Sequence, residues 1–137
     1  MRAAPSYPEH LPVLVRTAAT VGAVDLGEQL VAGVEARTPL RKHSVVAARA
    51  VLAEGRSDTA AAADLYLDAA DRWAAFATPV EEAYALLGAG RCLLALGRMA
   101  EATVALERAH SLWVSLKAAP LLAETDALLE RTVSLSA

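Results

Sequence analysis

The sequence predicts an all-α fold in which three helix hairpins stack and a single helix closes the stack, about seven helices in total. Ala and Leu, the two strongest helix formers, supply most of the apolar residues, which make up 55% of the 137-residue chain, while aromatic residues make up 4%. Pro39, Pro79 and Pro120 lie 40 and 41 residues apart. Residues between them echo at a step of 40: Ala62 and Ala102, Tyr66 and Leu106, Ala69 and Ala109, Trp73 and Trp113. Self-similarity of this length indicates one helical unit that repeats along the chain.

The N-terminal part carries the weakest form of this unit, over residues 9–37. Residues 1–8 contain two prolines and no hydrophobic periodicity, so we expect an extended arm there. A first helix is predicted from about residue 9 to residue 21. This helix tolerates Pro12 only because the proline falls in its first turn, where a missing N–H breaks no hydrogen bond. Asp25 then starts a second helix, whose apolar stripe runs to Val34.

The second hairpin is predicted over residues 38–77. Thr38 and Pro39 have the pattern of an N-cap followed by proline at the first helical position. We expect this third helix to end near residue 54, and a turn to lead to a fourth helix that reaches Phe76.

The third hairpin, over residues 78–118, repeats the same start. Thr78 and Glu81 have the spacing of a capping box, and Gly97 is placed to end the fifth helix in a left-handed conformation. A sixth helix follows, from about residue 99 to 117. Residues 119–137 then form a capping helix with a polar face, as the last element of a stack requires.

The unit from Ala83 to Val114 resembles a tetratricopeptide repeat. The positions that carry the resemblance are Leu86, Ala89, Gly90, Leu93, Gly97, Ala102, Leu106 and Ala109. Small residues at Gly90 and Ala102 let two helices approach closely, while the leucines fill the space between hairpins. The chain departs from the family in its longer period and in Ala89 and Leu93, which stand where Leu and an aromatic residue are usual. The resemblance implies a right-handed superhelical stack whose inner, concave surface is lined by the first helix of each hairpin.

A narrower resemblance concerns the run from Trp73 to Gly97. It is similar to the C-terminal repeat regions of actinobacterial signalling proteins that join an AAA/STAND ATPase domain to a LuxR-type DNA-binding domain or to an adenylate or guanylate cyclase domain. Neither companion domain is recognisable in this sequence. The resemblance implies a regulatory or scaffolding role.

Composition argues against several function classes. A net charge of −3 and an isoelectric point near 5.6 provide no basic face for nucleic acid. The lone Cys92 excludes an internal disulfide, and with no signal peptide or membrane span expected, the chain is predicted to be cytoplasmic. A mean hydropathy of +0.34 is high for a small domain, which indicates apolar surface left for a partner, including a second copy of the chain.

No constellation of residues predicts catalysis, a cofactor or a metal. None of the three histidines, His10, His43 and His110, has a second ligand three or four residues away, and we expect each to be a solvated surface residue. Cys92 has no neighbouring base that would activate it as a nucleophile. The Gly88-Ala-Gly90 run lacks the strand and the Gly-Lys-Ser/Thr of a phosphate loop, so a helix–helix contact is the better interpretation.

Two groups of residues are candidates for partner binding. Tyr84, Leu87, Arg91 and Leu94 are predicted to face the concave surface. Arg91 can either clamp a carboxylate of a partner peptide or form an intramolecular salt bridge, and the sequence does not decide between them. Asp64, Asp68 and Asp71 share one face of the fourth helix, where a solvated acidic stripe is favoured over a contact for a basic partner.

These observations predict a protein–protein interaction module. It would bind another polypeptide, or a neighbouring domain of a parent protein, through its concave face. The main alternative is a domain that senses a small-molecule effector in a pocket near Tyr84 and Arg91. A helical enzyme is the least supported class, since no catalytic residues can be assigned.

Overall fold

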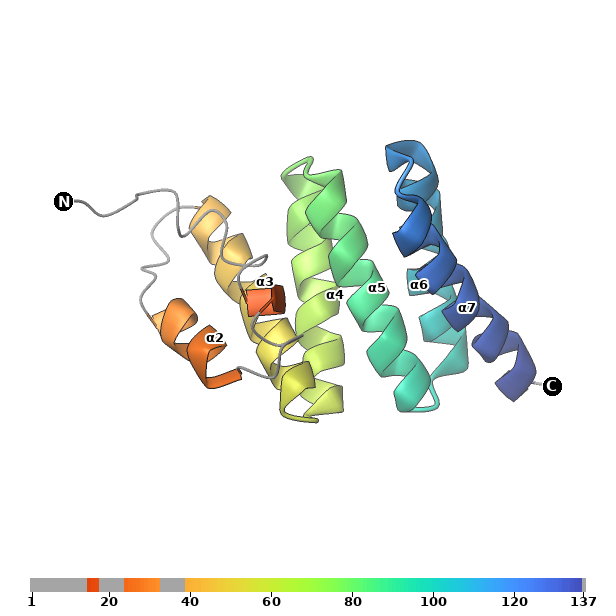
Figure 1. The fold of residues 1–137 in the computed structure, drawn as a ribbon, viewed down its shortest axis with the longest axis horizontal. Coiled ribbons are helices and arrows are strands. Elements are labelled where there is room, and N and C mark those ends of the chain that lie inside the picture. The colour runs from red at the N-terminus through yellow and green to blue at the C-terminus, as the bar shows by residue number, and fades with distance from the viewer. Residues whose placement is uncertain (1–14, 18–23, 33–38, 137) are drawn as a thin grey trace.

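The computed structural model describes residues 15–17, 24–32 and 39–136 (Figure 1). Its elements are α2 (Val24–Ala32), α3 (Pro39–Gly55), α4 (Thr59–Ala75), α5 (Pro79–Ala95), α6 (Met99–Leu116) and α7 (Ala119–Ser136). Residues 15–17 form one more helical piece, and the described residues contain no strand. The predicted all-α class and number of helices are therefore confirmed. The expected arm at residues 1–8, the Thr38 cap and most of the first predicted helix lie outside the described residues.

Five helices begin at an equal spacing of 20 residues, at positions 39, 59, 79, 99 and 119. The 40-residue echo in the sequence therefore spans two such steps. Each loop contains one residue in the left-handed region, with φ between 55° and 77°: Ser57, Ala77, Gly97 and Lys117. The predicted role of Gly97 is confirmed, and the other three loops make the same turn without glycine.

The four loops share one hydrogen-bond pattern. In the first of them the N–H of Asp58 donates to the carbonyl of Ala53 (2.9 Å), and the N–H of Ser57 donates to the carbonyl of Glu54 (3.0 Å). These two bonds are the Schellman arrangement, which satisfies the last carbonyl groups of a helix. The carbonyl of Asp58 then accepts the first hydrogen bond of α4, from Ala62 (2.9 Å). One residue thus ends one helix and starts the next, which reverses the chain within a very short loop.

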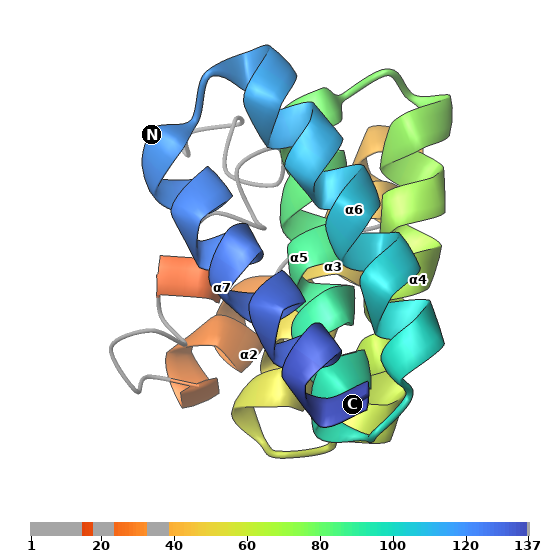
Figure 2. The same cartoon turned by 90° about the vertical axis from the view of Figure 1, so that its right-hand side faces the viewer.

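The helices form two layers. The first helices of successive units, α3, α5 and α7, lie side by side in one layer, and α4 and α6 form the other (Figure 2). The central helix α5 contacts α3, α4, α6 and α7, which explains why its residues from Ala83 to Leu94 are almost all buried. At the N-terminal end α2 packs against α3.

Two glycines of α5 permit close contact between the layers. A Cβ atom at Gly88 would lie 2.5 Å from the Tyr66 ring on α4, and a Cβ at Gly90 would lie 2.3 Å from Leu106 Cδ2 on α6. Both distances are far shorter than the 3.5–4.0 Å of ordinary carbon contacts. Tyr66 and Leu106, which the echo pairs, therefore each pack over a glycine of the same helix. The prediction that this glycine run forms a helix–helix contact is confirmed.

The predicted capping box at the start of α5 is wrong. Thr78 is the N-cap residue, but its side chain makes no cap hydrogen bond and its hydroxyl instead donates to the carbonyl of Phe76 (3.4 Å). The Glu81 carboxylate, which would complete the box, accepts hydrogen bonds from Arg16. A guanidinium offers this carboxylate two charged donors, whereas the N-cap backbone offers one neutral N–H.

Candidate functional site

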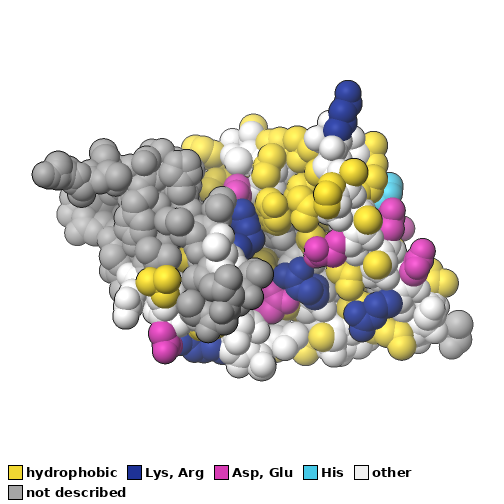
Figure 3. All heavy atoms as spheres, viewed as in Figure 1, with side chains coloured by type: hydrophobic (Ala, Val, Ile, Leu, Met, Phe, Trp, Pro, Cys, Tyr) yellow, Lys and Arg dark blue, Asp and Glu magenta, His cyan; other side chains and the backbone are white. Residues whose placement is uncertain are grey.

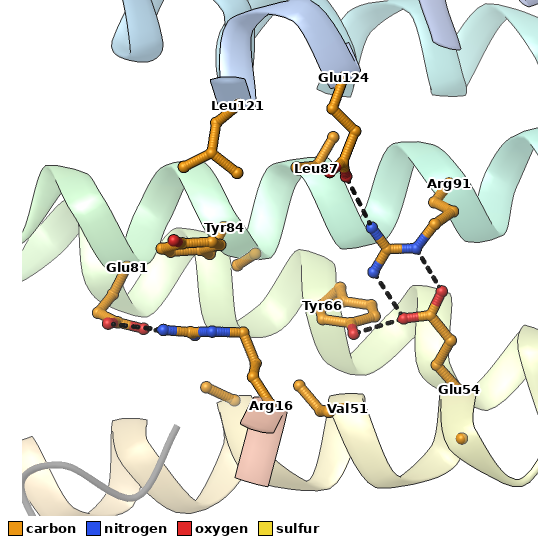
Figure 4. Close-up of a pocket in the computed structure, with 13 residues that line it drawn as sticks. Arg16, Val51, Glu54, Tyr66, Glu81, Tyr84, Leu87, Arg91, Leu121 and Glu124 are labelled. Atoms are coloured by element: carbon orange, nitrogen blue, oxygen red, sulfur yellow. Dashed lines mark hydrogen bonds and ion pairs between the residues drawn. The ribbon is translucent and has the colours of Figure 1, made fainter. Parts of the chain in front are cut away.

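A hollow of about 350 Å³ opens on the face formed by α3, α5 and α7, beside residues 15–17. Basic and acidic side chains meet across the middle of this face, with hydrophobic side chains next to them (Figure 3). The lining side chains used below are Arg16, Val51, Glu54, Tyr66, Glu81, Tyr84, Leu87, Arg91, Leu121 and Glu124 (Figure 4). They come from separate segments of the chain, so only the stacked fold brings them together.

Arg91 links the three helices of this layer. Its guanidinium donates two hydrogen bonds to the Glu54 carboxylate of α3, from Nε (2.6 Å) and from Nη2 (2.7 Å). On the other side its Nη1 lies 3.6 Å from Oε2 of Glu124 on α7. The hydroxyl of Tyr66 on α4 donates to Glu54 Oε1 (2.7 Å). We call Glu54, Tyr66, Arg91 and Glu124 the charged network.

The network perturbs the titration of its members. Burial favours the protonated form of Glu54, but the hydrogen bonds and charge of Arg91, with the Tyr66 hydroxyl, outweigh burial and hold the pKa of Glu54 below its ordinary value. Hydrogen bonding to Glu54 raises the pKa of Arg91 against the effect of burial. Burial and the charge of Glu54 raise the pKa of Tyr66. All three groups therefore keep one protonation state around neutral pH, as a fixed structural link would.

The intramolecular salt bridge is thus the arrangement of Arg91 in this structure. The sequence left open whether Arg91 pairs within the chain or waits for a partner carboxylate. Its guanidinium here contacts two carboxylates of the chain, Glu54 and Glu124. The Glu124 contact is longer and the side chains of Arg91 and Glu124 are both about half exposed, so this end of the network faces the open hollow.

A second charged contact lies at the other end of the hollow. Arg16 Nη1 donates to Glu81 Oε1 (2.9 Å), and Nη2 donates to Oε2 (3.3 Å). The guanidinium carbon lies 4.0 Å from the centroid of the Tyr84 ring. That ring is held edge-on against Trp113 of α6, with centroids 5.1 Å apart. We call Glu81 and Tyr84 the Arg16 cradle.

An apolar wall separates the charged network from the Arg16 cradle. Val51 of α3, Leu87 of α5 and Leu121 of α7 line it, and Leu87 is only 2% exposed. Three of the four residues predicted for the concave face, Tyr84, Leu87 and Arg91, therefore line the hollow. Leu94 does not line it and is 4% exposed within the hydrophobic core.

The three predicted acidic residues lie elsewhere. Asp64, Asp68 and Asp71 belong to α4, in the other layer, and all three are exposed. Asp68 accepts a hydrogen bond from Arg72 Nε at 3.0 Å, one turn along the same helix. The structure does not bring these residues together with the hollow.

Cysteine and histidine side chains hold structural positions. Burial and the nearby charge of Glu54 raise the pKa of Cys92 to about 12, so its thiol stays protonated at neutral pH.

His43 does not fit the expected solvated role, because its ring packs edge-on against Trp73 and Phe76 and its Nδ1 is buried. The Nε2 atom of His110 lies 3.3 Å from Oδ1 of Asp126. Among the described residues, no group of three potential ligands could hold a metal ion.

Sequence reasoning missed the partners that complete the hollow. Glu54 lies 37 residues from Arg91, and Arg16 lies 65 residues from Glu81. These pairs depend on the register between stacked helices, which the 40-residue echo does not specify. The available signal was the single residue Glu54 at the end of the third predicted helix, where a carboxylate is unfavourable to the helix dipole and so suggests a tertiary partner.

Comparison of the chain with known protein families, with curated proteins and with solved structures finds no match. The likeness to tetratricopeptide repeats therefore remains a prediction made from the residues. None of the described helices is long and apolar enough to cross a lipid bilayer.

Proposed function

We propose that this chain is a protein-interaction scaffold of regulatory or signalling type that binds a polypeptide segment in the hollow of α3, α5 and α7. The segment would belong to another cytoplasmic protein or to another domain of a parent protein. The stack would act as a superhelical, tetratricopeptide-like support and would carry out no chemistry itself.

The observation that carries this proposal is the composition of the hollow. A peptide has an apolar side chain every few residues and a polar backbone between them, so its site needs apolar and polar surface in alternation. The hollow provides an apolar wall of Val51, Leu87 and Leu121 between two charged groups. These side chains project from packed helices and not from loops, which lowers the entropic cost of binding.

A peptide library displayed on phage tests the proposal. Selection against the wild-type protein should enrich peptides that lose their binding to Leu121→Glu, which places a charge on the apolar wall. The matched control is Leu96→Glu, at an exposed leucine that does not line the hollow (38% exposed). Enriched peptides that bind Leu121→Glu as tightly as wild type, or the absence of any enriched peptide, would overturn the proposal.

The size of the hollow favours one alternative, a small-molecule effector site. Its volume of about 350 Å³ falls at the lower end of the range typical of ligand pockets, about 300–1,000 Å³. Under this alternative a metabolite library should contain a compound that raises the melting temperature of wild type and not of Leu121→Glu, while no displayed peptide is enriched.

A further inference from the structure

Residues 15–17 lie against one end of the hollow, and Arg16 is one of its lining residues. Val15 is fully buried among the core residues, and the side chain of Arg16 is 24% exposed. Figure 4 shows the Arg16 side chain extending along the hollow between α3 and α5 toward Glu81, with the Tyr84 ring beside it. A buried valine and the arginine that follows it thus border one end of the site that we propose for polypeptides.

The Arg16 cradle suits a guanidinium better than other cations. The two oxygens of Glu81 each accept one N–H of Arg16, a fork that an ammonium group cannot reproduce. The guanidinium also packs over Tyr84 at 4.0 Å, within the range of cation–π attraction. Glu81 and Tyr84 lie three positions apart on α5, so both point to the same side of a rigid helix.

If Arg16 were displaced, the Glu81 carboxylate would lose its basic partner, which costs free energy. The Glu81 side chain is only 17% exposed, and Arg16 is the one basic side chain that bonds to it among the described residues. A carboxylate that is largely buried without a partner is strongly unfavourable. A polypeptide that takes this end of the hollow therefore has to supply a guanidinium of its own. The charged network makes no such demand, because Arg91 already neutralises Glu54.

We infer that the hollow recognises a polypeptide segment in which an apolar residue is followed by arginine, and that residues 15–17 compete for the Arg16 cradle in cis. This inference rests on the proposed function and specifies its partner. The chain's own segment acts as a built-in competitor, so a partner binds at full strength only when it displaces Arg16.

A labelled synthetic peptide of residues 12–20 tests the inference by fluorescence anisotropy. It should bind the full-length Arg16→Ala variant about tenfold more tightly than wild type, because the cradle of the variant is empty. The same peptide with citrulline in place of arginine keeps the shape and loses the charge, and it should bind the variant about tenfold more weakly. Adding Glu81→Gln should abolish this preference for arginine, whereas Glu101→Gln, in an exposed pair with Arg98 on α6, should leave it unchanged.

A measurement on wild type keeps the test independent of how well Arg16→Ala folds. Excess arginine peptide should raise the hydrogen exchange of the amides at residues 15–17, and the citrulline peptide should not. Equal binding of the two peptides, equal affinity for wild type and Arg16→Ala, or unchanged exchange at saturation would each overturn the inference. If the phage selection still yields peptides specific for the hollow, the proposed function stands; if no peptide of any sequence binds there, both fail.

Discussion

The contact between Gly90 and Leu106 supports a quantitative prediction about the spacing of α5 and α6. Replacing Gly90 by Ala places a Cβ atom 2.3 Å from Leu106 Cδ2 and 2.4 Å from Leu106 Cγ. Because Cγ lies close to the backbone and Leu106 is fully buried, a rotamer change alone cannot clear the overlap. Overpacking of this kind costs up to about 3 kcal/mol, and the better helix propensity of Ala returns about 1 kcal/mol. The free energy of unfolding should therefore fall by about 2 kcal/mol.

A double-mutant cycle isolates that contact. Leu106→Ala removes the atoms with which the new Cβ collides, at the usual cost of a cavity of about 2–5 kcal/mol. In this background Gly90→Ala should be stabilising by about 1 kcal/mol, from helix propensity alone. The two effects of Gly90→Ala then differ by about 3 kcal/mol, which urea denaturation followed by circular dichroism resolves.

The control for the cycle is Gly97→Ala. A Cβ atom at Gly97 would meet no packing neighbour within 4 Å, but the φ of this residue is 77°, so Ala should cost about 1 kcal/mol through the backbone in either background. A stabilising effect of Gly90→Ala in the wild-type background would refute the reasoning, because α5 and α6 would then lie further apart than described.

Three further predictions concern the loops, the charged network and the thiol. Ala77 has a φ of 55°, so Ala77→Gly should raise the stability by about 1 kcal/mol in thermal denaturation. The pKa of folded Glu54 lies below its ordinary 4.5, so its contribution is present at neutral pH and is lost as the pH falls through the folded pKa. Glu54→Gln should lose about 1–3 kcal/mol at pH 7 and show a smaller further loss on acidification to about pH 3 in urea titrations. Cys92, with a pKa of about 12, should react with Ellman's reagent at about pH 8 at least about tenfold faster in urea than in the folded state.

The sequence predicts the stack well because its signals are local. Pro39 and Pro79 mark two helix starts within the residues that form them, and Gly97 marks a helix end. The 20-residue spacing of the helices was not predicted, because two of the helix starts and most of the loops lack such a local signal. The helices that begin at Thr59 and Met99 carry no proline, and three of the four left-handed loop positions are not glycine.

The site was predicted less completely because it depends on the register between helices. Tyr84, Leu87 and Arg91 share one face of α5, and helical spacing alone places them together. Their counterparts, Glu54 and Arg16, approach α5 from segments 37 and 65 residues away, and no local pattern specifies which side chains then meet. The predicted capping box is wrong for the same reason. The local pattern pairs the Glu81 carboxylate with Thr78, but Arg16, which is distant in the sequence, bonds to that carboxylate instead.

The equal spacing of the helices makes the length of this architecture easy to change. Any two left-handed loop positions 40 residues apart, such as Ser57 and Gly97, follow helices of the same layer and direction. Recombination between such points would add or remove one whole hairpin and would leave a loop of unchanged geometry at the junction. Only the side chains at the new helix–helix contact would need to fit one another, as Gly88 and Gly90 fit Tyr66 and Leu106. Gain and loss of hairpins is thus a route by which a helical stack of this kind changes its length.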